Sequence, residues 1–267
     1  MAVLEVSGAT VRFGAATVVD GVSLSVHAGE VVGLIGPNGA GKTVTFNVVT
    51  GLQKPTAGRV RLHGRDVTRA PPHVRTAMGL GRTFQVVQLF RGLSVVENIA
   101  VAAHHHTRSG LFSDALRLPG RRRALAEAHE RSLAVLDFLG LGSLADLPAD
   151  ALPVGQARLV ELGRALALQP DVLLLDEPAS GLDPAETHDF VQLLARVRAV
   201  LGVGMLLVEH DMGVVMPLCD HVVVMNQGTV LAVGRPDEVR HNPEVLEAYL
   251  GAPEPDEVEA VSLGSPA

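Results

Sequence analysis

The feature that most constrains this chain is the segment Gly36–Thr43 (GPNGAGKT), which follows the pattern G-x-x-x-x-G-K-[ST]. A short apolar run, Val31–Ile35, precedes it, and Lys42–Thr50 reads as a helix. When a strand, a glycine loop and a helix follow one another in this way, the backbone N–H groups of the loop and the positive N-terminus of the helix can surround phosphate groups. The loop residues are Gly36, Pro37, Asn38, Gly39, Ala40, Gly41, Lys42 and Thr43. The segment therefore predicts a phosphate-binding loop in which Lys42 neutralises phosphates and the Thr43 hydroxyl binds Mg²⁺.

Composition singles out the lysine of this loop. Of the 22 basic residues only two are lysines, Lys42 and Lys54, and the others are arginines. Lysine carries a compact charge on a flexible stem, whereas arginine carries a wide planar fork. Position 42 is therefore expected to be a place where only a compact ammonium fits.

A second motif places acids at the end of a buried strand. Val172–Leu175 is a short apolar run, and Asp176 and Glu177 follow it. In proteins with a phosphate-binding loop, an acid at the end of a second strand holds Mg²⁺. Asp176 is the predicted Mg²⁺ ligand, and Glu177 is placed to polarise a water molecule.

The order of strands and helices predicts an α/β fold. Further buried strands are expected at Met205–Val208 and Val222–Met225, and helices at Gln156–Leu168 and Glu186–Leu201. This alternation predicts a parallel sheet with helices on both faces. A small antiparallel sheet is expected from the short strands Ala2–Val6, Thr10–Phe13, Val22–Val26 and Arg59–Leu62. Residues 86–152 read as a mostly helical insertion that contains a helix at Arg121–Leu139.

Length and charge set the remaining limits. A chain of 267 residues forms one large domain or two small ones. Its single cysteine, Cys219, excludes an intramolecular disulfide. The chain shows neither a signal-peptide pattern nor an apolar run of membrane-spanning length, which predicts a soluble, cytoplasmic protein. A net charge of −7 disfavours nucleic acid as a partner.

Four more motifs, in the order of a known family, complete the pattern. These are Phe84-Gln85, Leu152-Pro153-Val154-Gly155-Gln156, Ser180-Gly181-Leu182-Asp183 and His210. With them, the chain resembles the ATP-binding subunits of ABC transporters over nearly its whole length. The resemblance implies a P-loop NTPase (RecA-like) core with a parallel sheet, an antiparallel β subdomain and an inserted helical subdomain. It also implies ATP and Mg²⁺ as cofactors.

The resemblance also implies a role for each motif. Two such chains would sandwich two ATP molecules, with the phosphate loop of one chain facing Gly155, Gln156 and Asp183 of the other. Glu177 would be the general base, His210 would hold the γ-phosphate and the water, and Gln85 would sense Mg²⁺. Phe13 would stack on adenine, although it could equally be a core strand residue.

Two positions depart from the family pattern. In Leu152–Gln156, which matches the family's signature segment, Pro153 replaces the usual serine and removes a hydroxyl and an N–H group. Val44 stands where relatives often have a second Ser or Thr, so one phosphate contact is absent although the backbone of Val44 stays in the nucleotide site. Neither change removes a catalytic group.

Within the family, the chain looks most similar to the ATPases of branched-chain (hydrophobic) amino acid importers. The motifs that carry this resemblance include Gly81–Gln85, Leu89–Arg91, Leu111–Ser113, Glu209–Met212 and Asn242–Val245 with Tyr249–Gly251. The implied partners are two transmembrane permease subunits, a second ATPase subunit and, indirectly, a periplasmic or extracellular binding protein. The implied location is the inner face of the cell membrane. Alternatives are urea or amide import, lipopolysaccharide export and a non-transport ABC ATPase.

The expected organisation is one ATPase domain over residues 1–251. Its β subdomain would comprise about 1–30 and 59–75, its helical subdomain about 86–158, and its core the remainder. A Pro-rich acidic tail, 252–267, is expected to be disordered. The apolar stretch Val86–Glu97 is expected either to form a groove for a membrane subunit or to lie in the core of the insertion. The run His104-His105-His106 is expected to be solvated surface, with a metal site as the alternative.

Overall fold

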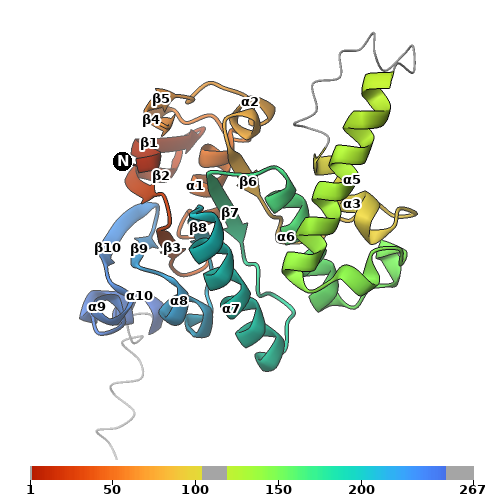
Figure 1. Cartoon of the computed structure of the whole chain (residues 1–267). Helices are drawn as coiled ribbons and strands as arrows, with labels where there is room; N and C mark the ends of the chain where they lie inside the picture. Colours follow the sequence, from red (N-terminus) through yellow and green to blue (C-terminus); the bar gives the residue numbers. More distant parts are fainter. Residues whose placement is uncertain (1, 104–118, 251–267) are drawn as a thin grey trace, which may run out of the picture.

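A computed structural model of the chain describes residues 2–103 and 119–250 (Figure 1). The His104–His106 run, the 252–267 tail and Leu111–Ser113 lie outside the described residues. No helix among those described is both long enough and apolar enough to cross a membrane.

A six-stranded sheet forms the centre of the molecule, in the order β10-β9-β3-β8-β7-β6. Its strands are β3 (Val31–Ile35), β6 (Leu80–Arg82), β7 (Val172–Asp176), β8 (Gly204–Val208), β9 (His221–Asn226) and β10 (Thr229–Gly234). The neighbours from β9 to β6 pair in parallel, and β10 pairs antiparallel with β9. The predicted parallel sheet is confirmed, and its buried strands lie within one or two residues of their expected bounds. The short β6 and the edge strand β10 were not predicted.

A four-stranded antiparallel sheet, in the order β2-β1-β4-β5, lies beside the central sheet. Its strands are β1 (Ala2–Phe13), β2 (Ala16–His27), β4 (Ala57–Leu62) and β5 (Arg65–Asp66). The prediction of two separate strands within residues 2–13 was wrong, because β1 runs through Gly8. Gly8 has a φ of 60°, and the β1–β2 register shifts between Val6 and Ala9. A bulge at this glycine keeps the strand continuous.

Helices α1 (Lys42–Thr50) and α7 (Pro184–Leu201) begin and end at clear signals. Helix α1 ends at Gly51, whose φ of 83° no other residue adopts easily. Helix α7 begins with a capping box, in which Asp183 and Glu186 each accept the other's backbone N–H. The remaining helices outside the insertion are α2 (Pro72–Ala77), α8 (Met212–Leu218), α9 (Pro236–Arg240) and α10 (Pro243–Leu250).

The insertion between β6 and β7 is helical, as predicted. It contains α3 (Val95–Ala103), α5 (Pro119–Leu139), α6 (Val154–Ala167) and the short 3₁₀ turns η2 (Gly142–Leu144) and η3 (Ala149–Ala151). Helices α3, α5 and α6 pack on one another and stand to one side of the sheets (Figure 1). Val95 and Val96 are buried in this packing, whereas Val86 is 69% exposed. The end of the stretch Val86–Glu97 therefore lies in the core of the insertion, and its start is exposed.

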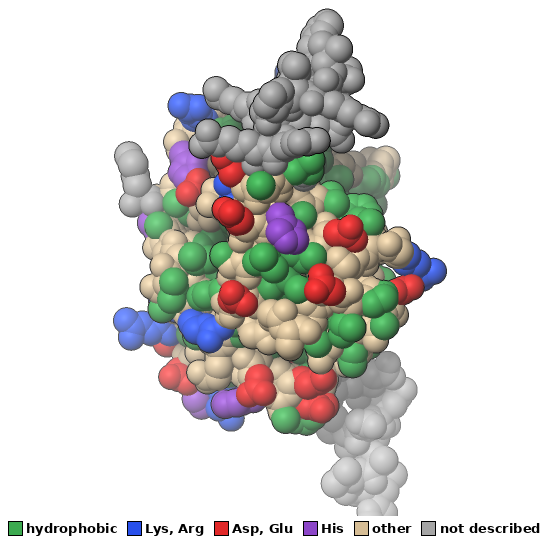
Figure 2. Space-filling model, turned by 45° about the vertical axis from the view of Figure 1, so that its right-hand side comes forward, with side chains coloured by type: hydrophobic (Ala, Val, Ile, Leu, Met, Phe, Trp, Pro, Cys, Tyr) green, Lys and Arg blue, Asp and Glu red, His purple; other side chains and the backbone are tan. Residues whose placement is uncertain are grey.

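Alternate residues of β7 face two separate cores. Leu173 and Leu175 join α3, α5, α6, α7 and α8 in one cluster. Val172 and Leu174 join α1 and the antiparallel sheet in the other. Helices therefore cover both faces, but α1 shares its face with the antiparallel sheet. Figure 2 shows part of the outer surface, where apolar side chains lie among scattered acidic ones and most of the basic side chains lie toward the edges of the view.

Candidate functional site

The phosphate loop connects the end of β3 to the start of α1. Gly36, Gly39 and Gly41 have φ angles of 147°, 81° and 96°, which strain any residue with a side chain. A Cβ added at Gly36 would lie 2.1 Å from the carbonyl oxygen of Met225, and one at Gly41 would lie 2.9 Å from that of Val18. Both conformation and space therefore require glycine at positions 36 and 41.

The side chain of Lys42 turns back into this loop and is largely buried. Its Nζ donates hydrogen bonds to the carbonyl oxygens of Gly36 (2.6 Å) and Pro37 (3.0 Å). Burial lowers the pKa of Lys42, and the Glu177 carboxylate raises it. The ammonium therefore lies where the sequence predicts phosphates, in a space bounded by backbone atoms.

Asp176 and Glu177 lie at the carboxyl end of β7, as predicted. Asp176 is the last residue of the strand and is buried. Burial raises the pKa of its carboxyl group, and the nearby Arg82 opposes this change. Glu177 has a φ of 45°, and its N–H donates to the carbonyl oxygen of Val208. Such strained non-glycine residues cost about 1–3 kcal/mol and cluster at functional sites.

Three predicted catalytic residues meet at the Glu177 carboxylate. Gln85 Nε2 donates a 2.8 Å hydrogen bond to Glu177 Oε2. His210 Nδ1 lies 3.9 Å from Glu177 Oε1, and its side chain is 64% exposed. Gln85 follows β6 and His210 follows β8, the strands on either side of β7. The parallel sheet therefore brings Gln85, Glu177 and His210 together at one edge.

Glu209 supports the loop that carries His210. It is buried, and its carboxylate accepts N–H groups from Ala179, His210 and Asp211. Its position after β8 was noted in the sequence, but its role in holding two loops together was not predicted. The sequence signal for this role was an acidic residue directly before His210.

Helix α6 holds the backbone of Phe84-Gln85, the segment called here the glutamine loop. These contacts were also not predicted. Glu161 Oε1 accepts the N–H of Phe84 at 3.1 Å. Arg158 donates to the carbonyl oxygens of Gln85 (3.2 Å) and Ser180 (2.8 Å). Burial raises the pKa of Glu161 to about 7, despite Arg158 and Arg164 nearby. Because the partners are backbone atoms, no sequence motif indicates these contacts.

The signature segment begins α6 two residues earlier than expected. Pro153 is the N-cap and Val154 the first helical residue. Gly155 and Gln156 therefore lie in the first turn, where N–H groups have no partner within the helix. Glu186 lies close by, since a Cβ added at Gly155 would come 2.6 Å from its Oε1.

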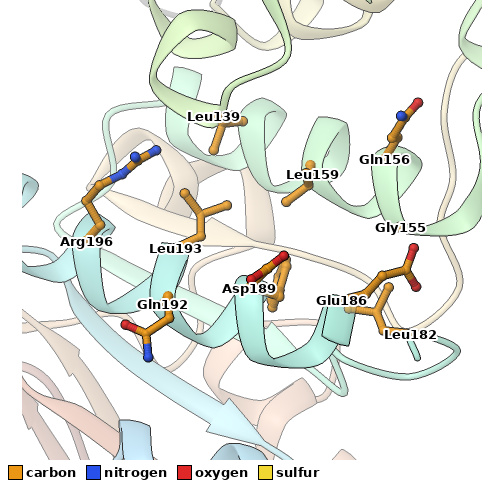
Figure 3. A pocket seen from close by; sticks show the side chains of 11 residues that line it. Leu139, Gly155, Gln156, Leu159, Leu182, Glu186, Asp189, Gln192, Leu193 and Arg196 are labelled. Atoms are coloured by element: carbon orange, nitrogen blue, oxygen red, sulfur yellow. The ribbon is translucent and has the colours of Figure 1, made fainter. Parts of the chain in front are cut away.

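Figure 3 shows the cavity of about 450 Å³ that this segment lines. Gly155 and Gln156 of α6 and Glu186 and Asp189 of α7 line it, and the Gln156 side chain points away from α7. Asp183 serves within the chain as the N-cap of α7. No residue of the phosphate loop lines this cavity. The structure thus separates the predicted nucleotide residues into two groups, one around the phosphate loop and one around the start of α6.

Two other predicted nucleotide residues take different positions. Phe13, the last residue of β1, is 51% exposed, which excludes the core position and leaves its ring accessible. Val44 packs against the apolar cluster that includes residues of α1, so its side chain contributes to core packing.

The predicted magnesium ligands carry donor atoms that suit this ion. Thr43, Gln85 and Asp176 supply hydroxyl, carboxamide and carboxylate oxygens, the hard ligands that Mg²⁺ prefers beside phosphate. Thr43 is exposed at the start of α1. In the described chain, no group of three or more His, Cys, Asp or Glu side chains could hold a metal by itself.

Comparison with known proteins decides the family. The sequence pattern of the ABC transporter family (ABC_tran) matches residues 19–180. The chain belongs to the ABC transporter family. It is an ATP-binding and ATP-hydrolysing P-loop cassette of that family, with the α/β fold predicted from its motifs.

Several ABC proteins resemble more than nine-tenths of the chain. It is 45% identical over 249 residues to the high-affinity branched-chain amino acid transport ATP-binding protein BraF of Pseudomonas aeruginosa, covering 93% of this chain and 98% of BraF. It is 45% identical over 248 residues to LivG of Escherichia coli, a protein of the same description, covering 93% and 97% of the two chains.

Solved ABC structures agree with this placement. A nucleotide-free ATP-binding cassette from an ABC transporter is 34% identical, with a TM-score of 0.82, and covers 94% of this chain and all of that one. The ADP conformation of the cassette MJ1267 is 34% identical with a TM-score of 0.80 and the same coverage.

A second pattern, the branched-chain amino acid ATP-binding cassette transporter pattern (BCA_ABC_TP_C), matches residues 229–255 of this ABC cassette. Its described part spans β10, α9 and α10. Tyr249 of α10 reaches the phosphate loop, where a hydrogen bond with the backbone of Gly36 lowers its pKa while burial raises it more. Tyr249 was cited for family likeness in the sequence, but this contact was not predicted.

Proposed function

We propose that this cassette powers an importer of branched-chain or other hydrophobic amino acids. The hydrogen bond from Gln85 to Glu177, with His210 3.9 Å from the same carboxylate, supports the hydrolytic part of the proposal. Likeness to BraF and LivG over more than nine-tenths of the chain supports the substrate class.

In the proposed reaction, the phosphate loop and Lys42 bind the β- and γ-phosphates. Mg²⁺, held by Thr43, Asp176 and Gln85, would neutralise charge on the phosphates. Glu177 accepts a proton from the attacking water, and His210 orients the γ-phosphate and that water. Phe13 stacks on adenine, for which its exposed ring at the end of β1 is suited. In the structure the Glu177 carboxylate accepts a hydrogen bond from Gln85, which supports an ionised, hydrogen-bond-accepting role for this group.

The active unit is proposed to contain two cassettes. Gly155 and Gln156 carry free N–H groups at the start of α6, yet they line a cavity without the phosphate loop. A second copy or a paralogous cassette would bring these amides to the γ-phosphate bound on the first, with Asp183 nearby. ATP thereby joins the two subunits, and hydrolysis releases them.

Each cassette is proposed to bind one of two permease subunits at a groove between the core and the insertion. A cavity of about 260 Å³ lies here, lined by Leu52 near the end of α1, by Phe84, and by Ala102 and Arg164 of the insertion. Arg164 Nε is buried there without a hydrogen-bond partner in the part of the chain that the structure describes. A cytoplasmic helix of the permease, with apolar side chains and one carbonyl or carboxylate acceptor, would satisfy both features. On this proposal the cassette lies on the inner face of the membrane, and a periplasmic or extracellular binding protein delivers substrate to the permease from the other side.

Reconstitution tests this proposal. The cassette, its permease subunits and the binding protein are placed in liposomes, and uptake of radiolabelled leucine, urea and acetamide is measured with and without ATP. ATP-dependent leucine uptake is expected. Uptake of only urea or acetamide would show that the cassette powers an amide importer instead. Failure of the cassette to form a complex with the permease subunits would contradict the proposal.

A further inference from the structure

Arg82 occupies an unusual position at the end of β6. It pairs with Leu174 in the parallel register, so its side chain lies beside the carboxyl end of β7. Its Nη2 lies 3.3 Å from Asp176 Oδ2, and both side chains are largely buried (17% and 8% exposed). The pair therefore joins two strands at the edge where the reaction is proposed to occur.

The same guanidinium also contacts α1 and the glutamine loop. Nη1 lies 3.4 Å from acceptors on Asn47 and Thr50 of α1. The guanidinium carbon lies 4.9 Å from the ring centroid of Phe46 on α1 and 5.0 Å from that of Phe84. One flat cation is thus positioned by two aromatic rings, an arrangement that suits arginine and not lysine.

We propose that Arg82 is a positioning residue for the Mg²⁺ carboxylate. By engaging Oδ2 of Asp176, it fixes the rotation of the carboxylate, and Oδ1 would remain to hold the cation. Because Phe84 precedes Gln85, the same side chain ties the second Mg²⁺ ligand to the first. Groups that orient a metal ligand typically change metal affinity by about 10- to 100-fold when removed.

This inference rests on the proposed role of Asp176 as an Mg²⁺ ligand. The charged groups around the pair are Glu177, which follows Asp176, and Lys42, which interacts with Glu177. Neither residue makes a contact with Arg82 among those that the structure gives. Arg82 is therefore the cation that contacts Asp176, and its removal leaves the phosphate loop itself in place.

The test measures how much Mg²⁺ strengthens nucleotide binding. A non-hydrolysable ATP analogue is titrated calorimetrically into the protein in EDTA and in saturating Mg²⁺, and the ratio of the two affinities is compared between variants. Arg82→Gln is expected to reduce this ratio about tenfold or more without changing the affinity in EDTA. Arg82→Lys is expected to restore it only in part. A folded Arg82→Gln protein with the wild-type ratio would overturn the proposal.

Three further variants keep the result interpretable. Arg198→Gln is the matched control, because Arg198 likewise bonds an acid, Asp220, and a backbone carbonyl, yet packs elsewhere; its ratio should equal that of the wild type. If Arg82→Gln does not fold, Arg82→Met decides, because it keeps an unbranched side chain between the two rings and removes the cation that engages Asp176. A reduced ratio supports the proposal, and an unchanged ratio overturns it. Asp176→Asn with an unchanged ratio would instead show that the Mg²⁺ assignment of the proposed function is wrong.

Discussion

Glu161 should make the stability of this cassette depend on pH in a definite direction. Its carboxyl group is buried on α6, accepts the N–H of Phe84, and has a pKa raised by burial to about 7 from the model-compound 4.5. Between these two values the folded protein binds more protons at this group than the unfolded chain does. The free energy of unfolding contributed by Glu161 must therefore fall as pH rises through this window.

The size of the effect follows from the same two pKa values. Each pKa unit corresponds to about 1.4 kcal/mol, so the ionised Glu161 lowers stability by about 3 kcal/mol once the pH is above both values. Glu161→Gln keeps an oxygen that can accept the N–H of Phe84 and carries no charge at any pH. The variant should therefore gain about 3 kcal/mol over the wild type between pH 4.5 and 8.

Urea unfolding followed by circular dichroism, at half-unit steps from pH 5 to pH 8.5, measures this difference. The exposed Glu130→Gln on α5 is the matched control and should show a constant offset. A Glu161→Gln protein whose advantage does not grow with pH would refute the reasoning. An advantage that shrinks with rising pH would show that Arg158 and Arg164 outweigh burial.

Three further changes test other parts of the account. Lys42→Arg should lose ATP binding nearly as fully as Lys42→Ala, because a planar fork does not fit the backbone-lined loop; unchanged affinity in calorimetry would refute this. Pro153→Ser should strengthen ATP-dependent dimerisation by up to about 1.5–3 kcal/mol through a hydroxyl bond to the γ-phosphate, and an unchanged sedimentation profile would show that the hydroxyl is dispensable. Leu52→Asp, at an exposed position of the proposed permease groove, should uncouple transport from ATPase activity without loss of folding, whereas Val95→Asp in the core should unfold the insertion; equal unfolding of both would contradict a docking role for this groove.

The residues that sequence could predict are those whose chemistry depends on local order along the chain. Gly36–Thr43 and Asp176-Glu177 each follow a buried strand, and parallel pairing then brings their ends to one edge. Gln85 and His210 reach the same edge because they follow neighbouring strands. To predict that they meet at Glu177, the order of strands in the sheet had to be known. This order includes β6, which has only three residues and gives no strand pattern in the sequence.

The contacts that sequence could not predict use backbone partners or distant side chains. Glu161 and Arg158 bind main-chain atoms of the glutamine loop, and any sequence could supply those atoms. Arg82 was read only as part of a family motif, since its pairing with Asp176 spans more than ninety positions along the chain. Gly8 was read as a strand break because a bulge and a turn have the same local signal.

The central claim is that Glu177 activates water at a nucleotide shared by two cassettes. Single-turnover hydrolysis and sedimentation of Glu177→Gln with Mg²⁺ and ATP test this claim directly, with the exposed Glu244→Gln as control. The account predicts hydrolysis slower by about 10²–10⁴-fold, unchanged ATP affinity and an ATP-dependent dimer that persists. Hydrolysis at the wild-type rate, or a variant that stays monomeric at saturating ATP, would contradict it.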